Sequence, residues 1–592
     1  MLVQRHWLRE TYFILDDFSN FALAHIAGLG WDLLTANYNP WTTAGVHVAP
    51  GHRVLDWLVT VPAGNRYGAA ILAMVASIGG TLAFTLGMLD DLLGRRPWHL
   101  LIVFVLGLAF PLLITASWFA AGAHALPGLC FTAGSLWGYA RRRRTHSRWA
   151  LAATWLSMAI ALTFSPQPVL VVLYAGLLAV LVAPERLTPR TMLASLRADR
   201  LPLAGLAAIG GAYFLHEMIR SSAPAQGRTA RAFLDLLEAV ARDALPNVAG
   251  LALPSHLWVT VVLAVLGAAL LSALGRRGLS ALVFFAVVLV ANVAVTWFGR
   301  SDVGVAAATE ARYLTALTLG FWIAVAIALA PAARGPWRRL PEVRGRVSPA
   351  RATVLAAIAF ALVSAAAAKH YLGRLEAGFH GSGYTLQSSA AAKGLAYRLN
   401  RDLDRLDRSG ELRGLVNGEV PSPLYYPNHP INQIGYLGHA FNDHVAAEGR
   451  GPRLFALTPD AEVKPAVFTA AGPATARTCD GSCELVLTPR DPKAASPCFV
   501  RLRALSGVRV TATTFTLGRA LMKQGAPAGA DPSGKPLSRW DLGPVTLDAK
   551  RPDATLMTWA LDAYQVHVQL RGKGRFAVSG RLGTVRTSTA AG

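Results

Sequence analysis

The chain has 592 residues, of which 53% are hydrophobic and only 15% are charged, and its mean hydropathy is +0.38. Because soluble globular proteins carry about 25% charged residues, this composition excludes an ordinary soluble protein and predicts a membrane protein. In a soluble protein the formal net charge of +23 would suggest a nucleic-acid partner. Here we expect the excess positive charge in cytoplasmic turns, so no nucleic acid is implied. Four cysteines are too few for a disulfide framework.

Residues 1–67 precede the first long apolar run and are rich in polar and aromatic side chains, with Asp16-Asp17 and later His47, His52 and Arg53. Two adjacent carboxylates repel each other, which raises the pKa of one and suits a general base or a cation ligand. Alternatively, one of them caps a helix that begins near residue 18. For the two histidines, an ordinary loop position is as good an interpretation as a site.

About ten apolar runs between residues 68 and 369 approach the ~20 residues that a helix needs to cross a bilayer. The third, fourth and fifth are short, as in tilted helices or in helices broken around a cavity. The predicted ranges are 68–88, 98–117, 128–140, 149–164, 168–183, 201–219, 256–274, 279–298, 312–332 and 352–369.

Arginines set the predicted orientation, because positively charged loops stay on the cytoplasmic side. One set of turns holds most of them, including the run Arg141 to Arg144, which we interpret as a topology signal. Residues 1–67, the loops 220–255 and 299–311, and everything after 370 then lie outside. Asp90 and Asp91 fall at a cytoplasmic helix end and are expected to be solvated. In the loop 220–255, apolar residues at helical spacing from 233 to 245 predict an amphipathic helix in the membrane interface.

The composition changes after about residue 372, where apolar runs give way to a polar sequence interrupted by Gly and Pro. Leucines at 395, 399, 403 and 406 predict one amphipathic helix. Alternating residues at 508–512 and 566–570 predict strands. We expect an extracytoplasmic α+β domain over 373–592, mainly a β-sandwich of jelly-roll type.

Three of the cysteines, Cys479, Cys483 and Cys498, lie close together in this domain. Outside the membrane, one disulfide among them is expected, with one thiol left over. A zinc site is less favoured because no fourth ligand is evident.

Several features together resemble the GT-C class of integral-membrane glycosyltransferases, and in particular actinobacterial multi-pass proteins of that type. The residues that carry the resemblance are Asp16-Asp17, Gly45-Val46-His47, Pro50-Gly51-His52-Arg53, Trp118 with Leu126-Pro127, and Arg312-Tyr313 after Glu310. The resemblance covers nearly the whole length. It implies about 10 to 11 spans in the plasma membrane, with one span missing before the acidic pair.

The resemblance also implies an activity. Such enzymes transfer a sugar from a polyprenyl-phosphate donor to a cell-envelope glycan, glycolipid or protein on the outer face of the membrane. Asp16 or Asp17 would be the base, and Arg312 with Tyr313 would bind the lipid phosphate. His47, His52 and Arg53 would hold sugar or phosphate oxygens.

Two questions stay open at this point. A divalent cation (Mg, Mn or Ca) is compatible with Asp16 and Asp17, but a lone base also suffices. The rival function is a non-catalytic membrane protein, either a transporter of lipid-linked intermediates or a degenerate GT-C relative that binds glycan.

Overall fold

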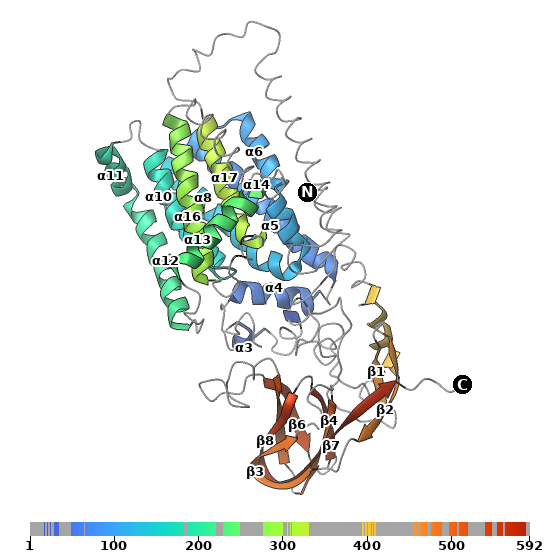
Figure 1. The fold of residues 1–592 in the computed structure, drawn as a ribbon. Coiled ribbons are helices and arrows are strands. Elements are labelled where there is room, and N and C mark those ends of the chain that lie inside the picture. The colour runs from blue at the N-terminus through green and yellow to red at the C-terminus, as the bar shows by residue number, and fades with distance from the viewer. Residues whose placement is uncertain are drawn as a thin grey trace.

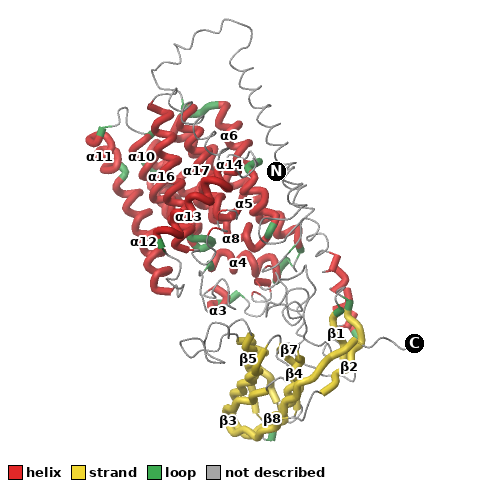
Figure 2. Tube along the Cα trace, viewed as in Figure 1, coloured by secondary structure: helices red, strands yellow, loops and turns green. Residues whose placement is uncertain are grey.

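The computed structural model describes residues 49–63, 66–182, 188–220, 229–248, 276–299 and 311–330, with single positions between 13 and 34 and at 305 and 308. Towards the C-terminus it describes positions between 394 and 409 and the ranges 454–458, 462–470, 475–487, 496–505, 508–518, 539–547, 553–560 and 563–587. Most of the described helices gather in one part of the molecule and the strands in another, and a helical segment at 394–408 lies beside the strands (Figure 2).

The N-terminal part is a helical bundle (Figure 1). Its elements are α3 (Trp31–Leu34), α4 (Pro50–Thr60), α5 (Tyr67–Leu93), α6 (Pro97–Gly107), α7 (Phe110–Ser117), α8 (Phe119–Thr145), α9 (Arg148–Leu162), the 3-10 turn η1 (Gln167–Leu170), α10 (Val171–Leu181), α11 (Pro189–Ala198), α12 (Arg200–Arg220), α13 (Ala230–Ala239), the π turn η2 (Val240–Ala244), α14 (Leu245–Val248), α16 (Arg276–Gly299) and α17 (Ala311–Leu329).

Three of the described helices are long and apolar enough to cross a membrane: Tyr67–Leu93, Arg276–Phe298 and Arg312–Leu329. Apolar helices at Trp98–Gly107, Arg148–Leu162 and Gln167–Leu181 are shorter. Helices therefore occupy eight of the ten predicted ranges, and the ranges 256–274 and 352–369 lie outside the described residues.

Two of the predicted ranges differ from the observed helices. The range 128–140 covers only the middle of α8, which begins at Phe119 and continues through the arginine run to Thr145. The range 98–117 is two helices, α6 and α7, separated by Leu108 and Ala109. Pro111 explains the break, because a helical proline lacks an amide hydrogen and clashes with the carbonyl four residues before it, here that of Gly107.

Small residues let α8 approach α9 closely, as is common between membrane helices. A Cβ atom on Gly138 would lie 2.8 Å from the Thr154 amide nitrogen and 3.1 Å from the Ala150 carbonyl oxygen. Close by, the Ser135 hydroxyl donates to the Thr154 carbonyl at 2.7 Å. The two backbones therefore meet directly, and the contact has no room for an added methyl group.

A buried tyrosine joins α10 to α17. The Tyr174 hydroxyl donates to the Ala316 carbonyl oxygen at 2.8 Å. Gly320 lies about one turn further along α17. A Cβ atom there would lie 3.0 Å from the Tyr174 hydroxyl oxygen and 2.8 Å from Val288 of α16. The hydrogen bond therefore joins α10 to α17, and Gly320 leaves the space in which α10, α16 and α17 meet.

Ion pairs gather at one end of the bundle, which we call the arginine end: the last turns of α5 and α8 and the first of α6 and α12. Arg144 lies 2.8 Å from a carboxylate oxygen of Asp91, whose side chain is only 4% exposed. The His99 ring nitrogen Nδ1 lies 2.7 Å from Asp90. The expectation that both aspartates are solvated is therefore wrong for Asp91.

A second cluster at the arginine end ties α8 to the junction of α11 and α12. Tyr139 donates to an Asp199 carboxylate oxygen at 2.6 Å. Arg143 lies 3.2 Å from that same oxygen. The arginine run therefore connects three helix ends, and its interpretation as a topology signal stays a prediction.

The predicted amphipathic helix of the loop 220–255 corresponds to α13. Its Phe233 ring lies edge-on to Trp297 of α16 at 5.8 Å, and Leu236 is 3% exposed. Its apolar face therefore packs against the bundle, while Leu234 stays 59% exposed.

The C-terminal strands form one eight-stranded antiparallel sheet organised around the longest strand. The strands are β1 (Leu454–Leu457), β2 (Val463–Ala470), β3 (Thr475–Leu487), β4 (Ser496–Ala504), β5 (Val508–Gly518), β6 (Arg539–Leu547), β7 (Asp553–Ala560) and β8 (Ala563–Thr587). Along its length β8 pairs with β5, β3, β4 and β2. Strands thus lie where the alternation at 508–512 and 566–570 predicts them, and the jelly-roll arrangement stays a prediction.

A disulfide joins Cys479 to Cys483 within β3. The strand has a bulge between Asp480 and Ser482, and Gly481 has a φ of 80°, a conformation that glycine adopts without strain. This local bend lets two residues of one strand bond to each other. The backbone of Cys498 lies in β4, and its side chain is outside the described residues.

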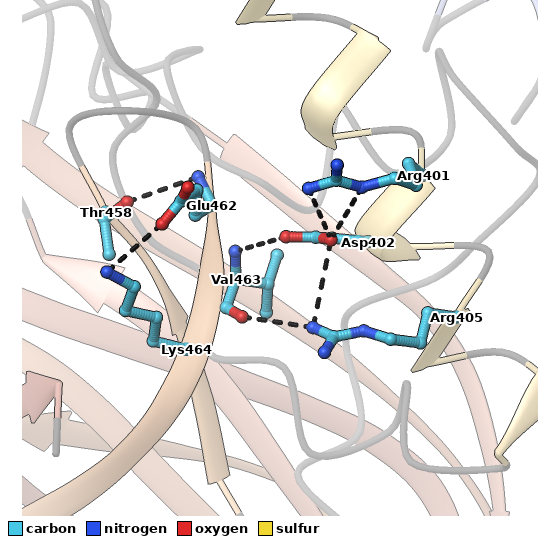
Figure 3. Close-up of polar contacts among 7 residues, drawn as sticks. All are labelled: Arg401, Asp402, Arg405, Thr458, Glu462, Val463 and Lys464. Carbon is cyan, nitrogen blue, oxygen red and sulfur yellow. Dashed lines mark hydrogen bonds and ion pairs between the residues drawn. The ribbon is translucent and has the colours of Figure 1, made fainter. Parts of the chain in front are cut away.

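The predicted helix before the sheet is present, since every described residue from 394 to 408 is helical. Its leucines at 395, 399, 403 and 406 are at most 8% exposed. The Asp402 carboxylate accepts the Val463 amide at 2.9 Å, and Arg405 donates to the Val463 carbonyl at 3.3 Å (Figure 3). This helix is therefore hydrogen-bonded to the first residue of β2.

We expect Gly138→Ala to destabilise the protein by about 1–3 kcal/mol, because the added methyl group forces α8 and α9 apart. Gly211→Ala in α12 is the matched control, since a Cβ there meets no atom within 4 Å, and it should be neutral or slightly stabilising. Thermal unfolding of the purified full-length protein compares the two. Equal melting temperatures for both variants would contradict the close contact.

Candidate functional site

The Pro50-Gly51-His52-Arg53 motif forms the first turn of α4. Pro50 occupies the first helical position, where its missing amide hydrogen has no cost. The Gly51 amide donates to the Thr163 carbonyl at 3.0 Å, and a Cβ on Gly51 would collide with the side chains of Thr163 and Phe164. Glycine is therefore required for α4 to meet the end of α9.

The next two residues of the motif point into the protein, since His52 and Arg53 are both 0% exposed. Arg53 donates to the Asn20 side-chain oxygen at 2.8 Å and lies 3.4 Å from Asp56. His52 Nε2 lies 3.2 Å from the other oxygen of Asp56, which is also 0% exposed. Arg53 therefore joins the N-terminal segment to α4 within a buried charge pair.

Asp17 binds the N-terminus of α8. Its carboxylate accepts the Ala120 amide at 2.6 Å, and the side chain is 0% exposed. The first amides of a helix have no partner within the helix, and its N-terminus carries partial positive charge, so a carboxylate is favoured there. Asp17 is thus a cap, as one interpretation expected, but of a helix about 100 residues away in sequence.

Arg312 reaches the same end of α8 from the first turn of α17. Its guanidinium carbon lies 5.1 Å from the centre of the Trp118 ring and 5.1 Å from that of Tyr313. Trp118 is the residue directly before α8. Cation–π contacts of this kind hold a guanidinium group in place while it keeps its charge.

Gln167 of η1 is hydrogen-bonded to the backbone of Arg312. Its amide nitrogen donates to the Arg312 carbonyl at 3.3 Å, and Thr315 donates to the same carbonyl at 3.1 Å. Thr315 also lies 3.4 Å from the Gln167 side-chain oxygen. The first turn of α17 therefore has a polar brace on the side of η1.

These contacts bring an acidic and a basic side chain to one end of α8, which we call the cap end: Asp17, Trp118, Ala120 and Arg312. The 27 residues of α8 span about 40 Å at 1.5 Å each. The cap end is therefore separated from the arginine end by about the thickness of a bilayer.

A histidine pair lies next to the cap end. The His52 ring is 5.9 Å from that of His124, in edge-to-face orientation, and His124 is about one turn along α8 from Ala120. The motif on α4 therefore supports the same portion of α8 that Asp17 caps.

Two of the predicted site residues, Asp16 and His47, lie outside the described residues. Within the described part of the chain, no group of three or more His, Cys, Asp or Glu side chains is placed to hold a metal ion. The predicted cation site at Asp16 and Asp17 stays a prediction, because Asp16 is not among these residues.

The sequence analysis missed Asn20, Asp56 and Gln167. Asp56 had a usable signal, because it stands three and four residues after Arg53 and His52 and thus shares their helix face. Asn20 and Gln167 make contacts distant in sequence, which no local pattern reveals.

Comparisons with known proteins find limited similarity. No protein-family model and no curated protein matches the chain. Among solved structures, it is similar to the arabinosyltransferase EmbB from Mycobacterium smegmatis, a cryo-EM structure, with 13% sequence identity and a TM-score of 0.28. The match covers 99% of this chain, which spans 64% of the length of EmbB. A TM-score this low does not define a family.

We expect Asp56→Asn to destabilise the protein by about 3–5 kcal/mol, because it takes a negative charge away from a buried arginine. Glu238→Gln is the control, since its partner Arg242 lies 3.9 Å away and both side chains are largely exposed. That substitution should cost less than about 1 kcal/mol. Denaturant unfolding of the full-length protein measures both, and a small effect of Asp56→Asn would argue against the buried pair.

Substitutions of Asp17 separate its hydrogen bond from its charge. Asparagine keeps an oxygen that accepts the Ala120 amide, whereas Asp17→Ala removes the cap and should cost about 1–2 kcal/mol. Asp17→Asn should lose less than half as much. Thr229→Ala, which removes the exposed cap of α13, calibrates the melting temperatures. Equal losses for both Asp17 variants would show that charge, and not the hydrogen bond, stabilises α8.

Proposed function

We propose that the protein is a GT-C-like membrane glycosyltransferase. It transfers a sugar from a polyprenyl-phosphate donor to a glycan, glycolipid or protein of the cell envelope, on the outer face of the plasma membrane. The observation that carries this proposal is the convergence of Asp17 and Arg312 at the cap end. The two come from opposite ends of the sequence of the helical bundle, and both are residues that the GT-C resemblance singles out.

The proposed reaction needs one proton acceptor and one stabiliser of negative charge. The acceptor hydroxyl loses its proton as its oxygen bonds to the anomeric carbon of the sugar. The bond from that carbon to the lipid phosphate breaks, and the phosphate leaves with the electron pair. A carboxylate takes the proton, and a guanidinium group stabilises the departing phosphate.

The contacts of Asp17 suggest different roles for the two carboxylates of the acidic pair. One oxygen of Asp17 already accepts the Ala120 amide. We therefore assign Asp17 to fixing the cap end. Asp16 is then the first candidate for the proton acceptor, and Asp17 is the second. Arg312, held between Trp118 and Tyr313, is the candidate phosphate-binding cation.

In this proposal the buried residues Arg53 and Asp56 position the site and do not contact the substrate. Arg53 is bonded to Asn20 and lies beside Asp56, which favours positioning of the N-terminal segment over direct contact with sugar oxygens. His52, next to Asp56 and His124, has the same placement. Arg312 is then the cation on which donor binding depends.

The disulfide supports an extracytoplasmic C-terminal domain. Disulfides persist in oxidising compartments and are rare in the cytosol, and Cys479 is bonded to Cys483. The predicted orientation puts the cap end on the same outer side, opposite the arginine end.

One observation favours the rival function. A carboxylate used as a helix cap is explained without chemistry, which suits a transporter of lipid-linked intermediates or a degenerate GT-C relative that binds glycan. The two functions differ in whether any sugar linkage depends on the acidic pair.

The test is complementation of a strain that lacks the protein, with envelope linkage analysis and transfer from a radiolabelled polyprenyl-phosphate sugar in isolated membranes. The wild type should restore a lost linkage. Asp16→Asn with Asp17→Asn should lower the transfer rate by about 10²–10⁴-fold, and Arg312→Gln by about 10²–10³-fold.

Arg231→Gln, an exposed arginine of α13, is the matched control and should retain full transfer. Comparing the two single aspartate variants tells which carboxylate accepts the proton. Full restoration by the double asparagine variant would sink the enzyme proposal and leave the carrier or glycan-binding function.

A further inference from the structure

The short helix α11 lies at the arginine end, and the bundle buries none of its side chains. It has ten residues, and not one of them is buried. A helix of this length is marginal in water, because most helical stability comes from burial of an apolar face. Its N-terminus is well capped by Thr188 and Thr191, but a cap fixes where a helix begins and does not cover its apolar side chains.

One face of α11 carries two leucines and two arginines, which we call the α11 face: Arg190, Leu193, Leu196 and Arg197. These positions lie within about 120° around a helix that turns 100° per residue. All four side chains are exposed, Leu193 by 48% and Leu196 by 37%. The range 189–198 contains no acidic residue.

Neighbouring contacts place this face at the arginine end of the bundle. Asp199, the residue that ends α11, bonds to Tyr139 and Arg143 at the C-terminal end of α8. Figure 1 shows α11 at the end of the bundle opposite α4. Trp149, which follows the α8 arginines in the first turn of α9, is 85% exposed, and exposed tryptophan next to arginine is typical of a membrane–water interface.

The positive charge of the α11 face favours an anionic lipid surface. Leucines can enter the acyl region while the long arginine side chains reach back to the headgroups. Basic side chains at the cytoplasmic surface are attracted by anionic lipids, and a guanidinium group pairs with phosphate oxygens in a fork geometry. Asp199 does not oppose this attraction, because Arg143 already neutralises it.

We propose that α11 is an interfacial helix whose α11 face docks on the anionic phospholipid headgroups of the cytoplasmic leaflet. The occupant of the exposed face is thus the bilayer surface itself. This inference is independent of the proposed enzymatic activity, since it concerns the opposite end of the bundle from the cap end.

Hydrogen exchange of the full-length protein in nanodiscs tests the proposal. One nanodisc contains a zwitterionic phosphatidylcholine alone, and the other adds phosphatidylglycerol. The amides of residues 190–199 should exchange more slowly in the anionic nanodisc, by up to about 30-fold for two arginines at the surface.

Arg190→Gln with Arg197→Gln should abolish the difference between the two lipids. Arg477→Gln with Arg575→Gln, two exposed arginines of β3 and β8, should leave it unchanged. Leu193→Ala with Leu196→Ala should speed exchange in both lipids.

Two results would overturn the proposal. Equal exchange of the wild type in both nanodiscs would mean that α11 is a solvated helix or is covered by a protein. A lipid difference that survives Arg190→Gln with Arg197→Gln would mean that other groups bind the headgroups.

Discussion

The bundle depends on polar contacts at both ends of α8, because a helix in an apolar environment gains little from hydrophobic contact with its neighbours. At one end the Asp17 carboxylate accepts the Ala120 amide. At the other, Tyr139 and Arg143 converge on Asp199, and Arg144 lies beside Asp91. Between them, Gly138 and Ser135 set the approach of α9. Both ends of α8 and its approach to α9 are thus fixed by named contacts, and the candidate site at the cap end depends on them.

Local composition predicted helices in eight ranges of the bundle and strands at 508–512 and 566–570, but not where some helices end. Sequence reasoning identified only 128–140 of α8, because His124 and Pro127 interrupt the apolar run before that range and charged arginines follow it, although all of these residues are helical. The break at Leu108 and Ala109 was predictable from Pro111. The amphipathic helix with buried leucines at 399 and 403 followed from its spacing, since a 3.6-residue period needs no tertiary information.

In the candidate site, the sequence indicated several of the residues but not their contacts. Asp17, Arg312 and Trp118 were singled out individually, and what could not be foreseen was their meeting place. The bond from Asp17 to Ala120 crosses about 100 positions of sequence, and the brace from Gln167 to Arg312 about 145. Such contacts depend on which helices become neighbours. Asp56, by contrast, could have been predicted from its spacing, because it stands four residues after His52 and three after Arg53. The sequence analysis considered only the basic residues of the motif and missed the carboxylate that pairs with them.

The reversal between α7 and α8 passes through a single extended residue, Trp118, and this limits how the chain can change length. Inserting one residue into the helix after Ala120 would rotate the rest of α8 by 100° and shift it by 1.5 Å. The cap on Ala120 and the contacts of Tyr139 with Asp199 would then no longer hold together. Natural variants of this fold should therefore tolerate substitutions in α8 far better than insertions or deletions, because the length of this helix sets the distance between the cap end and the arginine end.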